Sequence, residues 1–226
     1  MRSFTGVTSA EREGRIVVEA MAGTPKAELV KIFLKKRLAP ALFLCGLPGD
    51  VGGGVVMNAG IGEQIVPREF VEITDWVDVL DLESMQEKRF RKEDLRWTYR
   101  HCSGWQPGIL LKCGFSWPDQ SDESIPRRVK DATRLRLQKQ PLNLPSCGST
   151  FKNPLPQTAG ALIDRAGLKG FQVGGAQVSA KHANFIVNLG EATASDVHAV
   201  IEHVKGEVLR QFAVRLETEV KYLGRW

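Results

Sequence analysis

The chain has 226 residues, of which 42% are hydrophobic, with a formal net charge of +5 and a pI near 9.1. This length is enough for one large or two small domains with a buried core. The basic residues are scattered among 26 acidic ones, so the charge does not indicate nucleic acid, and a small anionic ligand fits it equally well. The uncharged stretch from Leu38 to Gly49 is too short to span a bilayer, and we find no signal-peptide h-region. We therefore expect a cytoplasmic protein without membrane insertion.

The hydrophobic pattern of the first half predicts both strands and helices. Three apolar or alternating segments are expected to form strands of one mixed sheet: 15–20, 70–81 and 109–117. An amphipathic helix is predicted over 26–37, and a single helical turn over 92–95. The stretch 46–62 contains so many glycines that we expect a loop system there and no regular element.

A linker with Pro, Asp and Ser is predicted at 118–125, and it separates a domain at 1–125 from a domain at 126–226. In the second domain we expect a basic helix over 126–140, a helix over 159–166 closed by Gly167, and strands over 171–179, 184–188 and 214–222. A helix is expected over 195–212, with Ser195 as its N-cap and an apolar face formed by Val197, Val200, Ile201, Val204 and Val208. The whole pattern predicts an α+β fold.

Four cysteines, at 45, 102, 113 and 147, lie far apart without the paired spacing of a zinc site. We expect reduced thiols and no metal.

The string Gly148-Ser149-Thr150-Phe151-Lys152-Asn153-Pro154 places a hydroxyl, an ammonium and an amide on one short loop. Such a loop is suited to holding an anion and presenting Ser149, although a loop-capping hydroxyl is the ordinary role of a serine.

Several strings occur together in this order: Gly46-Leu47-Pro48-Gly49-Asp50-Val51-Gly52-Gly53-Gly54 with Met57-Asn58-Ala59-Gly60; Tyr99-Arg100-x-x-Ser103; the serine string with Ala159-Gly160-x-Leu162-Ile163-Asp164; His182-Ala183-Asn184-Phe185-Ile186-Val187-Asn188; and Leu216-Glu217-Thr218-Glu219-Val220. The set resembles the UDP-N-acetylenolpyruvoylglucosamine reductases, the MurB flavoenzymes of peptidoglycan synthesis. The spacing between Gln177 and Asn188 is that of the family's shorter type.

The resemblance implies a partial FAD-binding domain of the PCMH/vanillyl-alcohol-oxidase type, followed by a smaller substrate domain. It implies an oxidoreductase that uses NADPH and FAD to reduce UDP-N-acetylglucosamine enolpyruvate to UDP-N-acetylmuramate, and so a part in cell wall biogenesis, cell shape and cell division. The protein would supply orientation and charge while the flavin supplies the electron chemistry.

Site residues follow from the same resemblance. Ser149 would protonate C2 of the enolpyruvyl group, Arg100 would hold its carboxylate with two hydrogen bonds, and Glu219 would act as acid or hydrogen-bond partner. Glu217 shares the face of Glu219 on the predicted strand, and only the family pattern selects Glu219. Contacts to FAD are implied for Gly46, Leu47, Pro48, Gly49, Val51, Gly52, Gly53, Asn58, Ala59 and Gly60, and contacts to substrate for Tyr99, Lys152, Asn153 and His182.

One departure keeps an alternative open. Family members usually carry a Gly-x-Gly-Ser-Asn segment that wraps the FAD pyrophosphate, and no such segment occurs here. The second interpretation is a truncated or degenerate homologue that binds the UDP-sugar without FAD and does not catalyse the reaction. Because this segment is absent, we expect these 226 residues to bind FAD weakly or not at all and to show little reductase activity, while the second domain still recognises the UDP-sugar.

Overall fold

The computed structural model describes residues 4–61 and 65–224 of the chain. The chain divides into two compact units, Met1–Arg134 and Leu135–Trp226, and each is described by itself. The division falls inside helix α4 (Ile125–Lys139), later in the chain than the boundary that the sequence predicts. No helix within the described ranges is long and apolar enough to cross a membrane.

The first unit is built on a five-stranded sheet. The strands are β1 (Val7–Arg12), β2 (Arg15–Met21), β3 (Thr74–Asp81), β4 (Glu87–Arg91) and β7 (Gly108–Pro118), in the order β1-β2-β7-β3-β4. Every pairing is antiparallel, so the prediction of a mixed sheet is wrong. β1–β2 and β3–β4 are hairpins. β7 lies between them and is antiparallel to β2 on one side and to β3 on the other. A parallel pair would need a crossover connection, which this chain path does not make.

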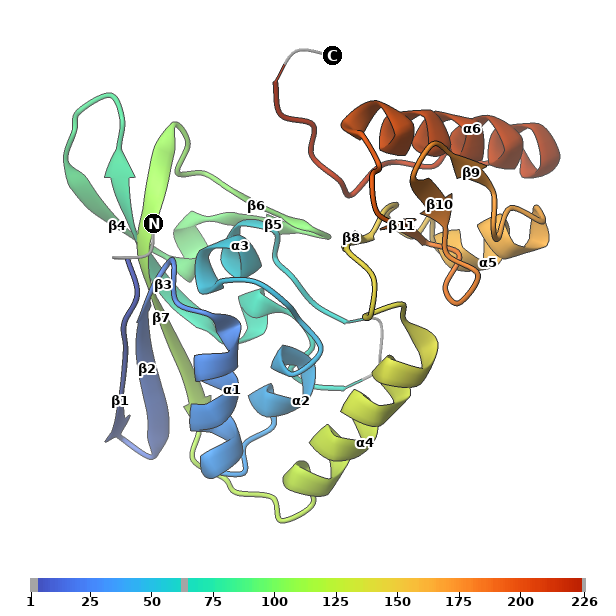
Figure 1. Ribbon diagram of the computed structural model, residues 1–226. Helices are drawn as coiled ribbons and strands as arrows, with labels where there is room; N and C mark the ends of the chain where they lie inside the picture. Colours follow the sequence, from blue (N-terminus) through green and yellow to red (C-terminus); the bar gives the residue numbers. More distant parts are fainter. Residues whose placement is uncertain (1–3, 62–64, 225–226) are drawn as a thin grey trace. The chain divides into compact units, whose positions relative to one another are not determined.

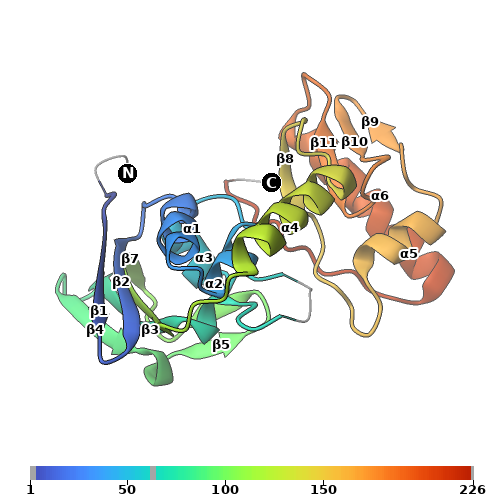
Figure 2. The ribbon, with the colours of Figure 1, turned by 90° about the horizontal axis from the view of Figure 1, so that it is seen from below.

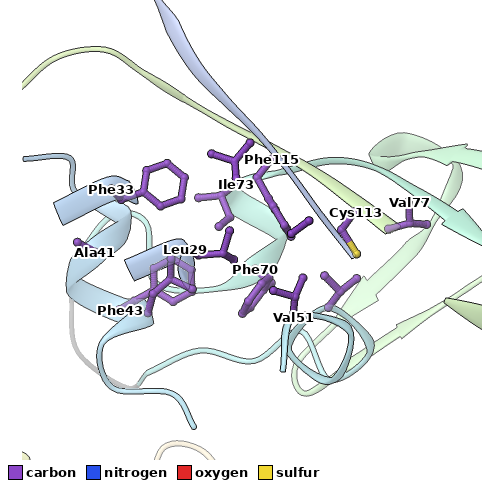
Figure 3. Packing of buried hydrophobic residues seen from close by; sticks show 14 of the residues in the cluster. Leu29, Phe33, Ala41, Phe43, Val51, Phe70, Ile73, Val77, Cys113 and Phe115 are labelled. Carbon is purple, nitrogen blue, oxygen red and sulfur yellow. The ribbon is translucent and has the colours of Figure 1, made fainter. Parts of the chain in front are cut away.

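Helices α1 (Lys26–Lys35), α2 (Pro40–Leu44) and α3 (Val51–Val56) lie together on one side of this sheet (Figures 1 and 2). Their apolar side chains bury an aromatic cluster with the strands. Phe70 meets Phe43 and Phe115 edge-to-face, with ring centroids 5.8 Å apart in both pairs. Figure 3 shows these rings among Leu29, Phe33 and Val51. Such pairs are favourable because the positive ring edge meets the negative face.

Helix α3 contradicts the prediction of a loop system at 46–62, as far as that segment is described. Its sequence is Val-Gly-Gly-Gly-Val-Val, and helix propensity alone disfavours it. Val51 and Val55 are fully buried, and a Cβ on Gly52 or Gly54 would lie within 3.0 Å of Ala22 or Phe70. Tertiary packing selects glycine here and holds the helix in spite of its weak propensity.

The other predictions for the first unit are confirmed with small changes. β2, α1 and β7 lie where they were expected, and so does α4, which the sequence assigned to the second domain. The predicted strand 70–81 begins with a 3-10 turn, η1 (Phe70–Glu72), before β3, and the predicted turn at 92–95 is the 3-10 helix η2 (Lys92–Asp94). The sequence did not predict β1, β4, α2, β5 (Arg96–Thr98) or β6 (His101–Ser103).

The second unit has an antiparallel sheet of β8 (Ser146–Ser149), β11 (Phe185–Asn188), β10 (Ala176–Val178) and β9 (Gln172–Val173), in that order. Helices α5 (Ala159–Arg165) and α6 (Ala194–Phe212) pack with it. α6 buries Val200, Ile201, Val204 and Val208, which is the face predicted from its periodicity apart from half-buried Val197.

Three predictions for the second unit are wrong. The strand expected at 171–179 is the hairpin β9–β10, because the chain turns at Gly174, which has φ +52°. Thr193, not Ser195, caps α6 by accepting from the N–H of Asp196. The expected strand 214–222 is an irregular segment with one isolated bridge, between Phe151 and Thr218, among the described residues. The segment that pairs with it, at Phe151, turns away at Asn153-Pro154 and leads into α5, so the strand pairing does not continue.

Candidate functional site

The glycine-rich segment 46–60, called the glycine segment below, is fixed to the start of α1 by main-chain hydrogen bonds. The N–H of Val51 donates to Thr24 O at 2.8 Å, that of Gly52 to Ala22 O at 2.8 Å, and that of Lys26 to Gly49 O at 3.0 Å. These bonds make residues 22–26 and 49–52 run side by side. The turn before α3 therefore has a defined backbone.

The glycines of α3 serve opposite faces of the helix. Gly52 and Gly54 face the protein interior, where a side chain would clash, whereas a Cβ on Gly53 would meet nothing within 4 Å. Pro48, Gly49 and Asp50 are exposed beside it. The main chain is therefore accessible at Gly49 and Gly53, between the side chains of Pro48 and Asp50, and a flat ring can lie close to the backbone at these two glycines.

The predicted FAD contacts divide by exposure. Pro48, Gly49 and Gly53 are exposed, and Gly46, Leu47 and Ala59 are half-buried. Val51, Gly52, Asn58 and Gly60 are buried and face the protein's own atoms. The first group offers surface to a ligand, while the second shapes that surface from beneath.

Asn58 uses its whole side-chain amide within the protein. It has a left-handed backbone with φ +38° and is 2% exposed. Its Nδ2 donates to Glu69 Oε2 and to Thr98 O at 3.1 Å each, and its Oδ1 accepts from Val71 N–H at 3.0 Å. Asn58 thereby ties the glycine segment to the residue that precedes Tyr99-Arg100. Its amide therefore holds that segment in place.

Arg100 meets the end of the glycine segment. It has φ +58°, its Nη2 donates to Gly60 O at 2.7 Å, and its Nη1 lies 3.8 Å from Glu69 Oε1. Its guanidinium also lies over the exposed ring of Tyr99, 4.7 Å from the centroid. Because a Cβ on Gly60 would lie 2.5 Å from Arg68 O, only glycine fits there. The structure thus brings Asn58, Gly60 and Arg100 together around Glu69.

In the second unit, Ser149 ends β8 opposite Phe185 of β11. It is half-buried, and the preceding Gly148 has φ +79° with open space around it. Residues 148–154 are called the serine loop below. The hydroxyl of Ser149 is therefore carried on a paired strand end beside an open backbone position.

Asn184 holds the serine loop and was not assigned a role from the sequence. Its main-chain O accepts from Thr150 N–H at 2.8 Å, its Oδ1 accepts from Phe151 N–H at 2.9 Å, and its Nδ2 donates to Phe151 O at 2.8 Å. Asn184 is 4% exposed, so these bonds are shielded from water. The signal in the sequence is an amide placed before an apolar strand, which gives no partner by itself.

The C-terminal segment, residues 214–222, lies along the other side of the serine loop. Glu219 N–H donates to Thr150 O at 2.9 Å, Lys152 N–H donates to Glu217 O at 2.9 Å, and Lys152 Nζ forms an ion pair with the Glu217 carboxylate. Glu217 is exposed and Glu219 half-buried. The exposed carboxylate is thus engaged by lysine, and Glu219 is attached next to Ser149 through the main chain.

The remaining predicted substrate contacts have local partners. Asn153 Oδ1 accepts from Ala159 N–H at 3.0 Å and so caps the start of α5. His182 Nδ1 accepts from Asn184 N–H at 3.3 Å, and its ring meets Phe185 edge-on at 4.8 Å. Burial lowers the pKa of His182, which favours the neutral ring that this bond requires. Within the described ranges no cluster of His, Cys, Asp and Glu is arranged to hold a metal ion.

The comparisons with known proteins cover residues of both units of the chain. Residues 140–223 match the family model of the UDP-N-acetylenolpyruvoylglucosamine reductase C-terminal domain. A UDP-N-acetylenolpyruvoylglucosamine reductase of Pediococcus pentosaceus is 41% identical over 208 residues, which cover 92% of this chain and 68% of that protein. The chain belongs to the UDP-N-acetylenolpyruvoylglucosamine reductase family.

Other relatives show how much of the family's length is present. The reductase of Syntrophobacter fumaroxidans is 42% identical over 210 residues, covering 93% of this chain and 59% of that protein. The crystal structure of the reductase from Thermus caldophilus matches with a TM-score of 0.73 at 34% identity, covering 88% of this chain and 70% of that chain. The chain therefore spans roughly three fifths to two thirds of these reductases' length, as the 59% and 68% values show.

Proposed function

We propose that this chain carries flavin-side and substrate-side residues of a reductase that uses NADPH to convert UDP-N-acetylglucosamine enolpyruvate to UDP-N-acetylmuramate. The observation that supports this most directly is the serine loop. Asn184 and the C-terminal segment hold its main chain from both sides while Ser149 stays accessible at the strand end. Such a fixed hydroxyl suits proton transfer, which depends on geometry when the acid is weak.

The residues divide the work. FAD, when bound and reduced by NADPH, would supply the hydride that C3 of the enolpyruvyl group receives. Ser149 would give its proton to C2, and Glu219, attached beside it, would stabilise the enol. Arg100 is already oriented by Gly60 O, and its guanidinium is suited to hold the carboxylate where negative charge grows. The exposed backbone of the glycine segment would receive the flavin.

The test is flavin reoxidation. The purified protein is loaded with FAD, reduced by NADPH without oxygen, and mixed with UDP-N-acetylglucosamine enolpyruvate in a stopped-flow instrument. We expect the flavin absorbance to return only when this substrate is present. Binding of the UDP-sugar by calorimetry without any flavin binding would instead favour the non-catalytic alternative. Reoxidation by other acceptors but not by this substrate would contradict the proposed reaction.

A further inference from the structure

The C-terminal segment, which carries Glu219, is attached to the serine loop by few main-chain contacts. Residues 214–222, all of which the structure describes, form no strand, and one isolated bridge at Thr218 joins them to the loop. On one side of this bridge Lys152 N–H donates to Glu217 O at 2.9 Å. On the other side Glu219 N–H donates to Thr150 O at 2.9 Å. The segment therefore lacks the row of paired residues that fixes a strand against its neighbour.

An ion pair lies beside this bridge. The ammonium of Lys152 pairs with the carboxylate of Glu217, and the two residues are directly opposite one another. Leu216, buried in the core of the unit, anchors the chain just before this pair. The Lys152 side chain is 22% exposed and that of Glu217 71% exposed, and a pair with so exposed a member contributes little to the stability of a fold. Its effect is therefore expected on the path of the chain between Leu216 and Glu219.

The charges around this pair favour one alignment of the segment. Glu217 and Glu219 are two residues apart, so a slip by two would bring Glu217 into the place of Glu219 opposite Thr150. The same slip would bring Arg215 opposite Lys152. Like charges in directly opposite positions destabilise a pairing, whereas opposite charges stabilise it. The pair of Lys152 with Glu217 thus opposes the alignment that presents the wrong glutamate.

The ion pair also bears on the substrate contact that the family resemblance implies for Lys152. A lysine that holds a phosphate does so as a positive charge. Here that charge is offset by Glu217, whose carboxylate would itself lie next to the bound anion and repel it. The pairing therefore favours a role for Lys152 within the protein over a direct contact with the substrate.

We propose that Lys152 and Glu217 are positioning residues, whose ion pair aligns the C-terminal segment so that Glu219, and not Glu217, lies beside Ser149. This role rests on the proposed function, in which Glu219 stabilises the enol while Ser149 protonates carbon. Lys152 and Glu217 act through the main chain of the segment and touch neither substrate nor flavin. Because the two residues act as one unit, removing both is expected to have the effect of removing either.

The experiment compares four variants with the unmodified chain: Lys152→Met, Glu217→Gln, the double variant and Arg210→Met. Arg210 forms an ion pair with Glu207 at 2.7 Å on α6 and serves as the matched control. Reoxidation of the reduced flavin is followed by stopped flow over a range of concentrations of UDP-N-acetylglucosamine enolpyruvate. We expect both single variants to lower the maximal rate roughly 3- to 10-fold, since displacing a positioned group slows the chemical step. The double variant is expected to be no slower, with the half-saturating concentration unchanged throughout and Arg210→Met equal to the unmodified chain.

A second readout does not depend on the reaction. The N–H of Glu219 donates to Thr150 O, so its hydrogen exchange, followed by NMR, reports how often the segment leaves the serine loop. We expect exchange to be roughly 3- to 5-fold faster in both single variants and in the double variant, because an ion pair with an exposed member contributes only modestly. In Arg210→Met the Glu219 amide is expected to exchange at the unmodified rate.

The outcomes separate this role from the proposed function. If the substrate does not reoxidise the flavin of the unmodified chain, the proposed function fails and this role fails with it. If the unmodified chain reacts but the Glu219 amide is equally protected in all variants, only the positioning role is wrong. A higher half-saturating concentration confined to Lys152→Met would overturn it in favour of a direct contact between Lys152 and the substrate. A loss of rate far larger in Glu217→Gln than in Lys152→Met would overturn it in favour of Glu217 acting at the enol itself.

Discussion

The glycine segment and the serine loop are both held by neighbouring main chain, but they are fixed in opposite ways. Close packing of the glycine segment depends on the lack of side chains at Gly52, Gly54 and Gly60, which allow contacts that any Cβ would block, and Asn58 adds side-chain hydrogen bonds near its end. The serine loop is held by the presence of one side chain, the amide of Asn184, which takes the place of a neighbouring strand. A surface for a flat or phosphate-bearing ligand needs bare backbone, whereas a proton donor needs a hydroxyl in a fixed position.

This difference predicts where function and stability separate. In the serine loop the group proposed to act, Ser149, is distinct from the group that holds the loop, Asn184. In the glycine segment, backbone that packs against the protein and backbone that is open to a ligand alternate along one short helix. Substitutions in the two regions are therefore expected to differ in kind, and the following experiments test that expectation.

The largest expected effect is that of Ser149→Ala. Only the step that protonates carbon needs this hydroxyl, so flavin reduction by NADPH is expected to stay nearly unchanged. Reoxidation by the enolpyruvyl substrate is expected to slow by roughly 10²- to 10⁴-fold, the usual contribution of a general acid. Stopped-flow absorbance measures both half-reactions. Ser146→Ala, exposed on the same strand, is the control, and equal reoxidation rates in the two variants would remove Ser149 from the mechanism.

Gly54→Ala and Gly53→Ala test the alternation within α3. The Cβ of the first would lie 2.5 Å from Phe70 Cε2, and Phe70 is fully buried, so we expect a loss of about 3 kcal/mol in the free energy of unfolding. The Cβ of the second enters open space, and alanine favours helix, so we expect a gain of about 0.5–1 kcal/mol. Urea denaturation measures both values. Equal effects would show that the two faces of α3 are not distinct.

Asn184→Ala tests the support of the serine loop. It leaves the N–H and C=O of Phe151 buried without their partner, so we expect a loss of about 2–3 kcal/mol in stability. Asn188→Ala, at the other end of β11, removes bonds to Gly190 and Ala192 in a more exposed turn and is expected to lose about 1 kcal/mol. A larger loss of stability in Asn188→Ala would show that the hydrogen bonds of Asn184 do not hold the serine loop in place.

Much of this architecture was predictable because local pattern and tertiary structure agree. β2, β7, α1 and the buried face of α6 follow from apolar periodicity. The sequence failed where a distant contact decides the local conformation. α3 forms because it packs closely against Ala22 and Phe70, where only glycine fits. Residues 214–222 do not form a strand ladder because the segment that they pair with leaves at Pro154. For the same reason the motifs named Ser149 and Arg100, while Asn184 and Glu69, which orient their surroundings, became visible only in the structure.

Lys26→Met sharpens the comparison, because a buried cation that packs beside the glycine segment is expected to oppose folding. Burial lowers the pKa of Lys26 from 10.5 to about 8. Allowing for the solvent that still reaches the ammonium, we expect the variant to gain about 2 kcal/mol at pH 7. Between pH 8 and 10.5 the unfolded chain binds more protons than the folded one, so the unmodified protein gains stability as pH rises. The two unfolding free energies are expected to converge there, and a constant gap would contradict the assigned pKa.

The smallest expected effect comes from Thr150→Val in the serine loop. The hydroxyl of Thr150 is fully buried and makes no hydrogen bond with any described residue, while its main chain bonds to Asn184 and Glu219 independently of the side chain. Valine keeps the shape and removes the unsatisfied group, so we expect the free energy of unfolding to rise by about 1 kcal/mol, as measured by thermal denaturation. Thr158→Val is the matched control with the opposite sign, because the Thr158 hydroxyl caps α5 and its loss is expected to cost about 1 kcal/mol. A loss of stability in both variants would mean that the Thr150 hydroxyl has a partner in solution, such as a buried water, and that the serine loop is held by more than Asn184 and the C-terminal segment.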